Sequence, residues 1–77
     1  MPNNQRCVIE LYISYQTADE VHWLARRADN HGVWAVGRGK GERGRVEATE
    51  EAIREFLITA ESLGYSGDLN DYEVKYL

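Results

Sequence analysis

The first regular segment of the chain alternates between apolar and mixed positions, and this alternation restricts the fold more than any other feature. From Cys7 to Ser14 the odd positions are all apolar, whereas the even positions carry apolar, charged, aromatic and hydroxyl side chains. Successive side chains of a β-strand point to opposite faces, so the pattern predicts a strand with one face against a core. The mixed second face indicates a sheet that helices cover on one side only.

Two later segments have the spacing of amphipathic helices. The first begins with a capping box at Thr17–Glu20, continues through apolar positions to Ala28, and ends at Gly32. The second begins at Thr49 and ends at Gly64. Its apolar positions, spaced for one helix face, are Ile53, Phe56, Leu57, Ala60 and Leu63.

Three more strands complete the prediction. Val33–Val36 and Arg45–Ala48 are short strands joined by the glycine-rich, mostly basic turn Gly37–Gly44, and Asp71–Leu77 alternates again as the last strand. The order strand–helix–strand–strand–helix–strand predicts an α+β, ferredoxin-like βαββαβ sandwich. We expect one domain over residues 1–77, with a four-stranded antiparallel sheet in the order 4-1-3-2 and two helices on one face.

Composition narrows the classes of partner. The net charge is −4, with seven basic against five acidic residues in 1–45 and two against eight in 46–77. Such an acidic balance argues against general nucleic-acid binding, although the polarised charge can orient a partner. One cysteine excludes an internal disulfide framework, and no apolar run reaches the length of a membrane span. We therefore expect a cytoplasmic protein without membrane contact.

No pattern of residues predicts catalysis, a metal site or a cofactor. Cys7, His22 and His31 have no zinc-ligand spacing, and Gly39–Gly41 precedes a predicted strand, unlike a Walker loop. The junction Ser14–Thr17 contains no basic residue that could bind phosphate. We expect no enzymatic activity.

Trp23, Arg26 and Arg27 form the first candidate contact group. On the predicted helix they lie opposite the apolar stripe, and an exposed Trp between two Arg has the composition of a protein–protein hot spot. One alternative is structural, with Trp23 packed flat on the helix beneath the two Arg side chains. Another is a rotated helix, in which Trp23 packs at the edge of the domain.

Two charged groups provide further candidates. Arg38, Lys40 and Arg43 in the glycine-rich turn suit a polyanion or an acidic partner, or simply keep a hairpin tip solvated. Glu51 and Glu55 lie on one face of the second predicted helix. With the other acids they could imitate the phosphates of a nucleic acid in another protein's channel, or serve solubility alone.

The uncovered sheet face is the last candidate. We expect it to carry Tyr12, Val8 and one of the two parities of Val33–Val36, with Tyr72 and Tyr76 as further members. Such a face suits either single-stranded RNA or a protein surface, including a homodimer contact. The predicted third strand, Arg45–Ala48, has no aromatic residue for stacking a base.

From these features we expect a non-catalytic protein-binding module, in particular a small inhibitor or adaptor of a larger assembly. A phage-type anti-defence protein of the anti-CRISPR kind, acting on a nucleic-acid-binding complex, fits the size and acidity. The alternative is a ferredoxin-like module that binds RNA or a small ligand.

Overall fold

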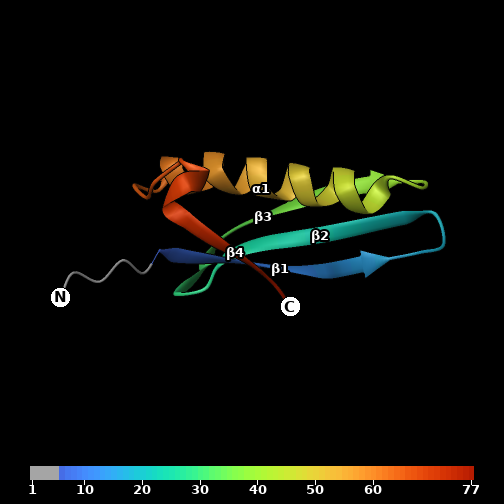
Figure 1. Ribbon diagram of the computed structural model, residues 1–77, viewed down its shortest axis with the longest axis horizontal. Helices are drawn as coiled ribbons and strands as arrows, with labels where there is room; N and C mark the ends of the chain where they lie inside the picture. Colours follow the sequence, from blue (N-terminus) through green and yellow to red (C-terminus); the bar gives the residue numbers. More distant parts are fainter. Residues whose placement is uncertain (1–5) are drawn as a thin grey trace.

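The computed structural model describes residues 6–77 as a mixed four-stranded sheet with one long helix against one face (Figure 1). The elements are β1 (Cys7–Gln16), β2 (Glu20–Arg27), β3 (Asn30–Lys40), α1 (Gly44–Ser62), the 3-10 turn η1 (Leu69–Asp71) and β4 (Tyr72–Tyr76). The sheet order is β3-β2-β1-β4, with β2 antiparallel to both neighbours and β4 parallel to β1. The α+β class is confirmed, whereas the second helix, the all-antiparallel sheet and the order 4-1-3-2 are wrong.

The predicted first helix is a strand. Val21, Trp23 and Ala25 alternate along β2 and face α1, so the period of two prevails over the helical spacing that the same segment contains. Pairing with β1 on one side and β3 on the other satisfies the backbone N–H and C=O groups of β2. In a helix the same groups would bond within the segment. The expected capping box is a turn, in which the Thr17 amide donates to the Glu20 carbonyl over 2.8 Å.

Most of the predicted glycine-rich turn belongs to β3. Gly37 and Gly39 face α1, and an added Cβ atom would lie 2.0 Å from the Ala48 carbonyl oxygen and 1.9 Å from that of Gly44, respectively. These two glycines therefore allow the helix backbone to lie directly on the strand. Only Gly41, with φ of +74°, has a left-handed conformation in this region.

The helix α1 begins earlier than its apolar pattern indicated. The predicted strand Arg45–Ala48 forms its first turn, and Thr49 donates its hydroxyl to the carbonyls of Arg45 and Val46 over 3.0 Å each instead of capping the helix. The end is as predicted, because Gly64 takes a φ of +90° just beyond the helix.

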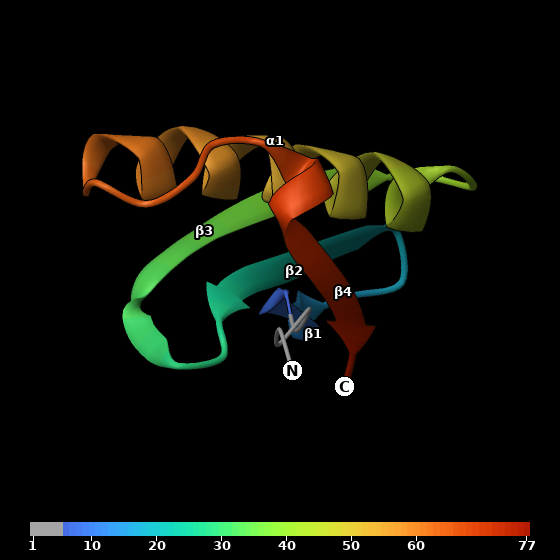
Figure 2. The same ribbon diagram turned by 60° about the vertical axis from the view of Figure 1, so that its left-hand side comes forward.

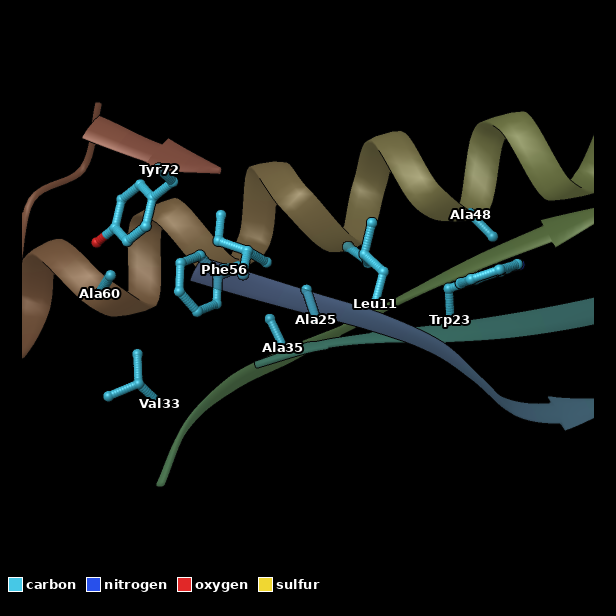
Figure 3. Close-up of a cluster of buried hydrophobic side chains, with 11 residues drawn as sticks. Leu11, Trp23, Ala25, Val33, Ala35, Ala48, Phe56, Ala60 and Tyr72 are labelled. Carbon is cyan, nitrogen blue, oxygen red and sulfur yellow. The ribbon is translucent and has the colours of Figure 1, made fainter. Parts of the chain in front are cut away.

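The core lies between α1 and the sheet (Figure 3). Small side chains of α1 bring the helix close to β2 and β3, and Phe56 fills the centre with no exposed surface. Its ring meets that of Tyr72 edge to face, with centroids 5.5 Å apart. The fully buried residues with the largest side chains are Phe56, Ile9, Leu11 and Val33.

The helix covers one face of the sheet, as the alternation in β1 predicted. Ile9 and Leu11 are buried beneath it, and Cys7 packs against the same core. Figure 1 shows α1 on one side of the strands, with no other described element on the opposite side. Within residues 6–77 no helix is both long and apolar enough for a membrane span.

Candidate protein-binding face

The sheet face opposite α1 carries a continuous set of aromatic, apolar and charged side chains, which we call the open face. The strand register places them in three cross-strand rows: Glu10–Arg26–Trp34, Tyr12–Leu24–Val36 and Tyr15–His22–Arg38. Directly paired residues share a face, so each row runs from β1 through β2 to β3. A bulge between Ile13 and Tyr15 moves the Tyr15 side chain onto this face.

Arg26 organises the polar side of the open face. Its Nε donates to Glu10 Oε1 over 2.9 Å, and its guanidinium carbon lies 4.9 Å from the Tyr12 ring centroid. The Nε2 atom of His31 lies 3.5 Å from the same Glu10 oxygen. These contacts restrict the Arg26 and Tyr12 side chains, and side chains that are restricted in this way lose less entropy when a surface binds.

Large side chains on the open face remain exposed to solvent. Trp34 is 51% exposed and Tyr15 is 50% exposed, while Leu24 and Val36 between them are only partly buried. The Tyr15 ring leans against His22, with centroids 4.8 Å apart. A contiguous apolar surface with aromatic side chains and a polar rim is typical of protein-binding sites.

The first predicted contact group is divided between the two sheet faces. Trp23 and Arg27 lie on the α1 side and are buried, at 4% and 9% exposure, whereas Arg26 lies on the open face. The expectation of an exposed Trp between two exposed Arg is therefore wrong, because a strand sends neighbouring residues to opposite faces. Whether Arg26 contacts a partner stays a prediction.

Arg27 is held by a set of contacts beneath the end of α1. It donates to both Asp29 carboxylate oxygens and to Cys7 Sγ, and its guanidinium carbon lies 4.2 Å from the Tyr65 ring centroid. Burial opposes the charged form, but the Asp29 carboxylate raises the pKa of Arg27 above its ordinary value. Burial also raises the pKa of neighbouring Tyr72, which stays a neutral hydrogen-bond donor to Ser66.

Trp23 lies at a pocket of about 440 Å³ between the β1–β2 turn and the loop before α1. Tyr76 meets its ring edge to face at 5.8 Å, and the Arg45 guanidinium lies 5.4 Å from the ring. Its Nε1 atom has no hydrogen-bond partner among the described residues. Trp23 therefore has a structural position, as the alternative prediction held, but it lies on a strand and not on a helix.

The charged candidates occupy three places. By register Arg38 and Lys40 extend from β3 on the open face, whereas Arg43 lies in the loop before α1. Glu51 accepts the Arg38 amide over 2.9 Å, and Glu55 is exposed one turn further along α1. The structure thus brings Arg26, Arg38 and Lys40 to one face.

Of the two parities that the sequence allowed for Val33–Val36, the structure places Trp34 and Val36 on this face. Tyr72 and Tyr76, expected here as further members, pair with Cys7 and Leu11 and so lie on the α1 side. Sequence reasoning missed Leu24, because it lies in the segment predicted as a helix. The available signal was the alternation of Val21, Trp23 and Ala25, which predicts that Leu24 points the opposite way. No cluster of three or more potential metal ligands occurs in the described part of the chain. Comparison of the chain with family models, curated proteins and solved structures gives no match.

Proposed function

We propose that this protein is a non-catalytic protein-binding module that contacts its partner through the open face. The observation that carries the proposal is the row Tyr12–Leu24–Val36, with the half-exposed Trp34 and Tyr15 beside it, on a face that no described element covers. Tyr, Trp and Arg are the residues most enriched in binding hot spots, and all three occur here.

The size and acidity of the chain favour a small inhibitor or adaptor of a larger assembly within this class. Inhibition of a nucleic-acid-binding complex, in the manner of an anti-CRISPR protein, is the specific form that we propose. Arg26, Arg38 and Lys40 of the open face would then contact acidic groups of the partner. The acidic second half of the chain would face away from the partner or compete with nucleic acid for a basic channel.

The proposal is tested with a face variant and a matched control. Trp34→Ala with Tyr15→Ala removes two half-exposed side chains from the open face, whereas Ile58→Ala with Leu63→Ala removes two from the helix side that are 59% and 55% exposed. We expect proteins retained on immobilised wild type and on the control to be lost with the face variant. With a purified partner, loss of a hot spot should weaken binding about 30-fold. Identical binding by both variants would refute the proposal.

RNA binding is the second candidate, and one observation favours it. The third strand does carry an exposed aromatic residue, Trp34, because the strand is Asn30–Lys40 rather than the predicted Arg45–Ala48. Tyr12 and Tyr15 on β1 complete a surface on which unpaired bases could stack.

A titration with single-stranded RNA at two salt concentrations separates the two candidates. RNA binding predicts quenching of Trp34 fluorescence that weakens strongly at the higher salt concentration. Protein binding predicts no quenching at either concentration, because the net charge of −4 opposes association with RNA.

A further inference from the structure

Strand β4 forms one edge of the sheet, and its outer side pairs with no other strand in residues 6–77 (Figure 2). The Leu77 amide donates to the Leu11 carbonyl over 2.8 Å, so odd-numbered residues of β4 direct their backbone groups toward β1. The backbone groups of Tyr72, Val74 and Tyr76 therefore point outward. Of these, the Tyr72 amide already donates to the Leu69 carbonyl.

The opposite edge of the sheet is protected in a way that β4 is not. On β3 the carboxylate of Glu51 accepts the outward amide of Arg38 and so occupies part of that edge. β4 contains no proline and no bulge, and no described side chain accepts its outward Val74 or Tyr76 amide. An unprotected edge strand is a surface for pairing with another strand.

The sequence of β4 is complementary to itself when it is reversed. Tyr72-Glu73-Val74-Lys75-Tyr76 has Tyr at both ends, opposite charges at the second and fourth positions, and Val at the centre. We propose that β4 is a homodimer interface, at which a second copy of the chain adds its own β4 antiparallel about a twofold axis at Val74. The result is one continuous sheet of eight strands, four from each copy.

This register uses the outward backbone groups that β4 offers. Val74 would exchange two hydrogen bonds with Val74 of the second copy, and each Tyr76 amide would donate to the Tyr72 carbonyl across the axis. Glu73 would lie directly opposite Lys75 of the second copy, in the closely spaced type of antiparallel pair. Both charged side chains are exposed, and neither forms an ion pair within residues 6–77.

The charges also select this register over its neighbours. Moving the axis to residue 73 places two Glu73 side chains opposite each other, and moving it to residue 75 does the same for two Lys75 side chains. Like charges directly opposite each other destabilise an antiparallel pair. Only the axis at Val74 pairs both charges of each copy favourably.

The contact also covers apolar surface on the helix side of the sheet. Tyr76 is 56% exposed and would lie opposite Tyr72 of the second copy. A single five-residue strand pair is nevertheless a small interface. We therefore expect a reversible dimer whose population rises with protein concentration.

The first test compares one substitution at the two sheet edges. Val74→Pro and Val36→Pro each remove an outward amide from an edge strand, where proline is tolerated because the amide has no partner within the sheet. Sedimentation equilibrium over a concentration series should show a dimer for the wild type and for Val36→Pro, and a monomer for Val74→Pro. A wild type that stays monomeric throughout the series, or a Val74→Pro variant that dimerises as well as the wild type, overturns the proposal.

A charge exchange tests the register and does not depend on the proline variants folding. Lys75→Glu places a second carboxylate opposite Glu73 across the axis, and Glu73→Lys with Lys75→Glu restores opposite charges. Both variants put a glutamate at position 75 beside Glu10 of β1, so they share the same charge repulsion within one copy. We expect the single variant to dimerise about tenfold more weakly and the double variant to recover. Equal dimerisation of both variants overturns the register.

This interface differs from the proposed partner site, although Lys75 lies beside Glu10 of the open face. It uses the edge of β4, and the open-face rows lie on β1, β2 and β3. A dimer that persists in the Trp34→Ala, Tyr15→Ala variant would support the β4 edge, and a dimer lost in that variant alone would contradict it.

Discussion

At the residue scale, two glycines set how closely the helix approaches the sheet. Gly37 and Gly39 leave no room for a Cβ atom against the backbone of α1, and both are buried. The same residues in a turn would tolerate many substitutions. Their position on the covered face of β3 makes them part of the core, although they have no side chain to bury.

Replacement of Gly37 by alanine should therefore destabilise the fold strongly. The new methyl group would lie 2.0 Å from the Ala48 carbonyl oxygen and 2.3 Å from the Ala52 amide nitrogen, so α1 must move. We expect a loss of about 3 kcal/mol in the free energy of unfolding, the upper part of the range for overpacking.

Gly32→Ala is the matched control for this prediction. Gly32 lies in the same strand, and its new methyl group would meet only the Asn30 side chain, at 3.2 Å. Its cost should be within about 0.5 kcal/mol. Urea denaturation of both variants measures the difference, and equal stabilities would contradict the close approach of α1 to β3.

At the element scale, α1 both covers the sheet and protects one of its edges. Its alanine-rich side lies on β2 and β3, while Glu51 reaches over the edge of β3 to accept the Arg38 amide. Glu55, one turn later, makes no such contact with a strand amide among the described residues. The two acids that the sequence presents as one pair therefore have different structural roles.

Removal of the Glu51 carboxylate should expose the edge of β3 locally. We expect Glu51→Ala to accelerate hydrogen exchange of the Arg38 amide at least about fivefold, which corresponds to about 1 kcal/mol for one hydrogen bond. Glu55→Ala should leave that rate unchanged. Exchange rates of single amides measured by NMR check this, and acceleration by both variants would assign the effect to the helix as a whole.

At the scale of the whole molecule, the single-sided helix layer places the two tryptophans in opposite environments. Trp23 is 4% exposed between α1 and the sheet, whereas Trp34 is 51% exposed on the open face. The covered side supplies the stability of the fold. The other side keeps aromatic and apolar surface that folding does not bury, and this is the surface that we assign to a partner.

Fluorescence quenching can report on both faces separately. In Trp34→Phe the remaining Trp23 should be shielded from acrylamide, and in Trp23→Phe the remaining Trp34 should be quenched several-fold more strongly. Trp23→Phe should cost only about 1 kcal/mol, because the Nε1 atom that it removes has no hydrogen-bond partner in the described chain. Equal quenching of the two tryptophans would contradict the assignment of the faces.

The candidate site was only partly accessible from the sequence. Three predicted contact residues share the open face, namely Arg26, Arg38 and Lys40. They do so because of the strand register, not because of a helix face or a glycine-rich turn. A helix over this segment would expose Trp23, whereas the strand buries it. The sequence leaves two parities open for Val33–Val36, and the choice that exposes Trp34 depends on which face α1 covers.

The local sequence pattern was sufficient to predict those elements whose pattern allows only one type of secondary structure. The alternation from Cys7 to Ser14 is compatible only with a strand covered on one side, and Gly64 ends the helix where predicted. The segment Val21–Ala28 contains both a period of two and a helical spacing, so local preference could not choose between them. Long-range contacts made the choice, because β1 and β3 together satisfy the backbone of β2 on both sides and bury Trp23 and Ala25 under α1.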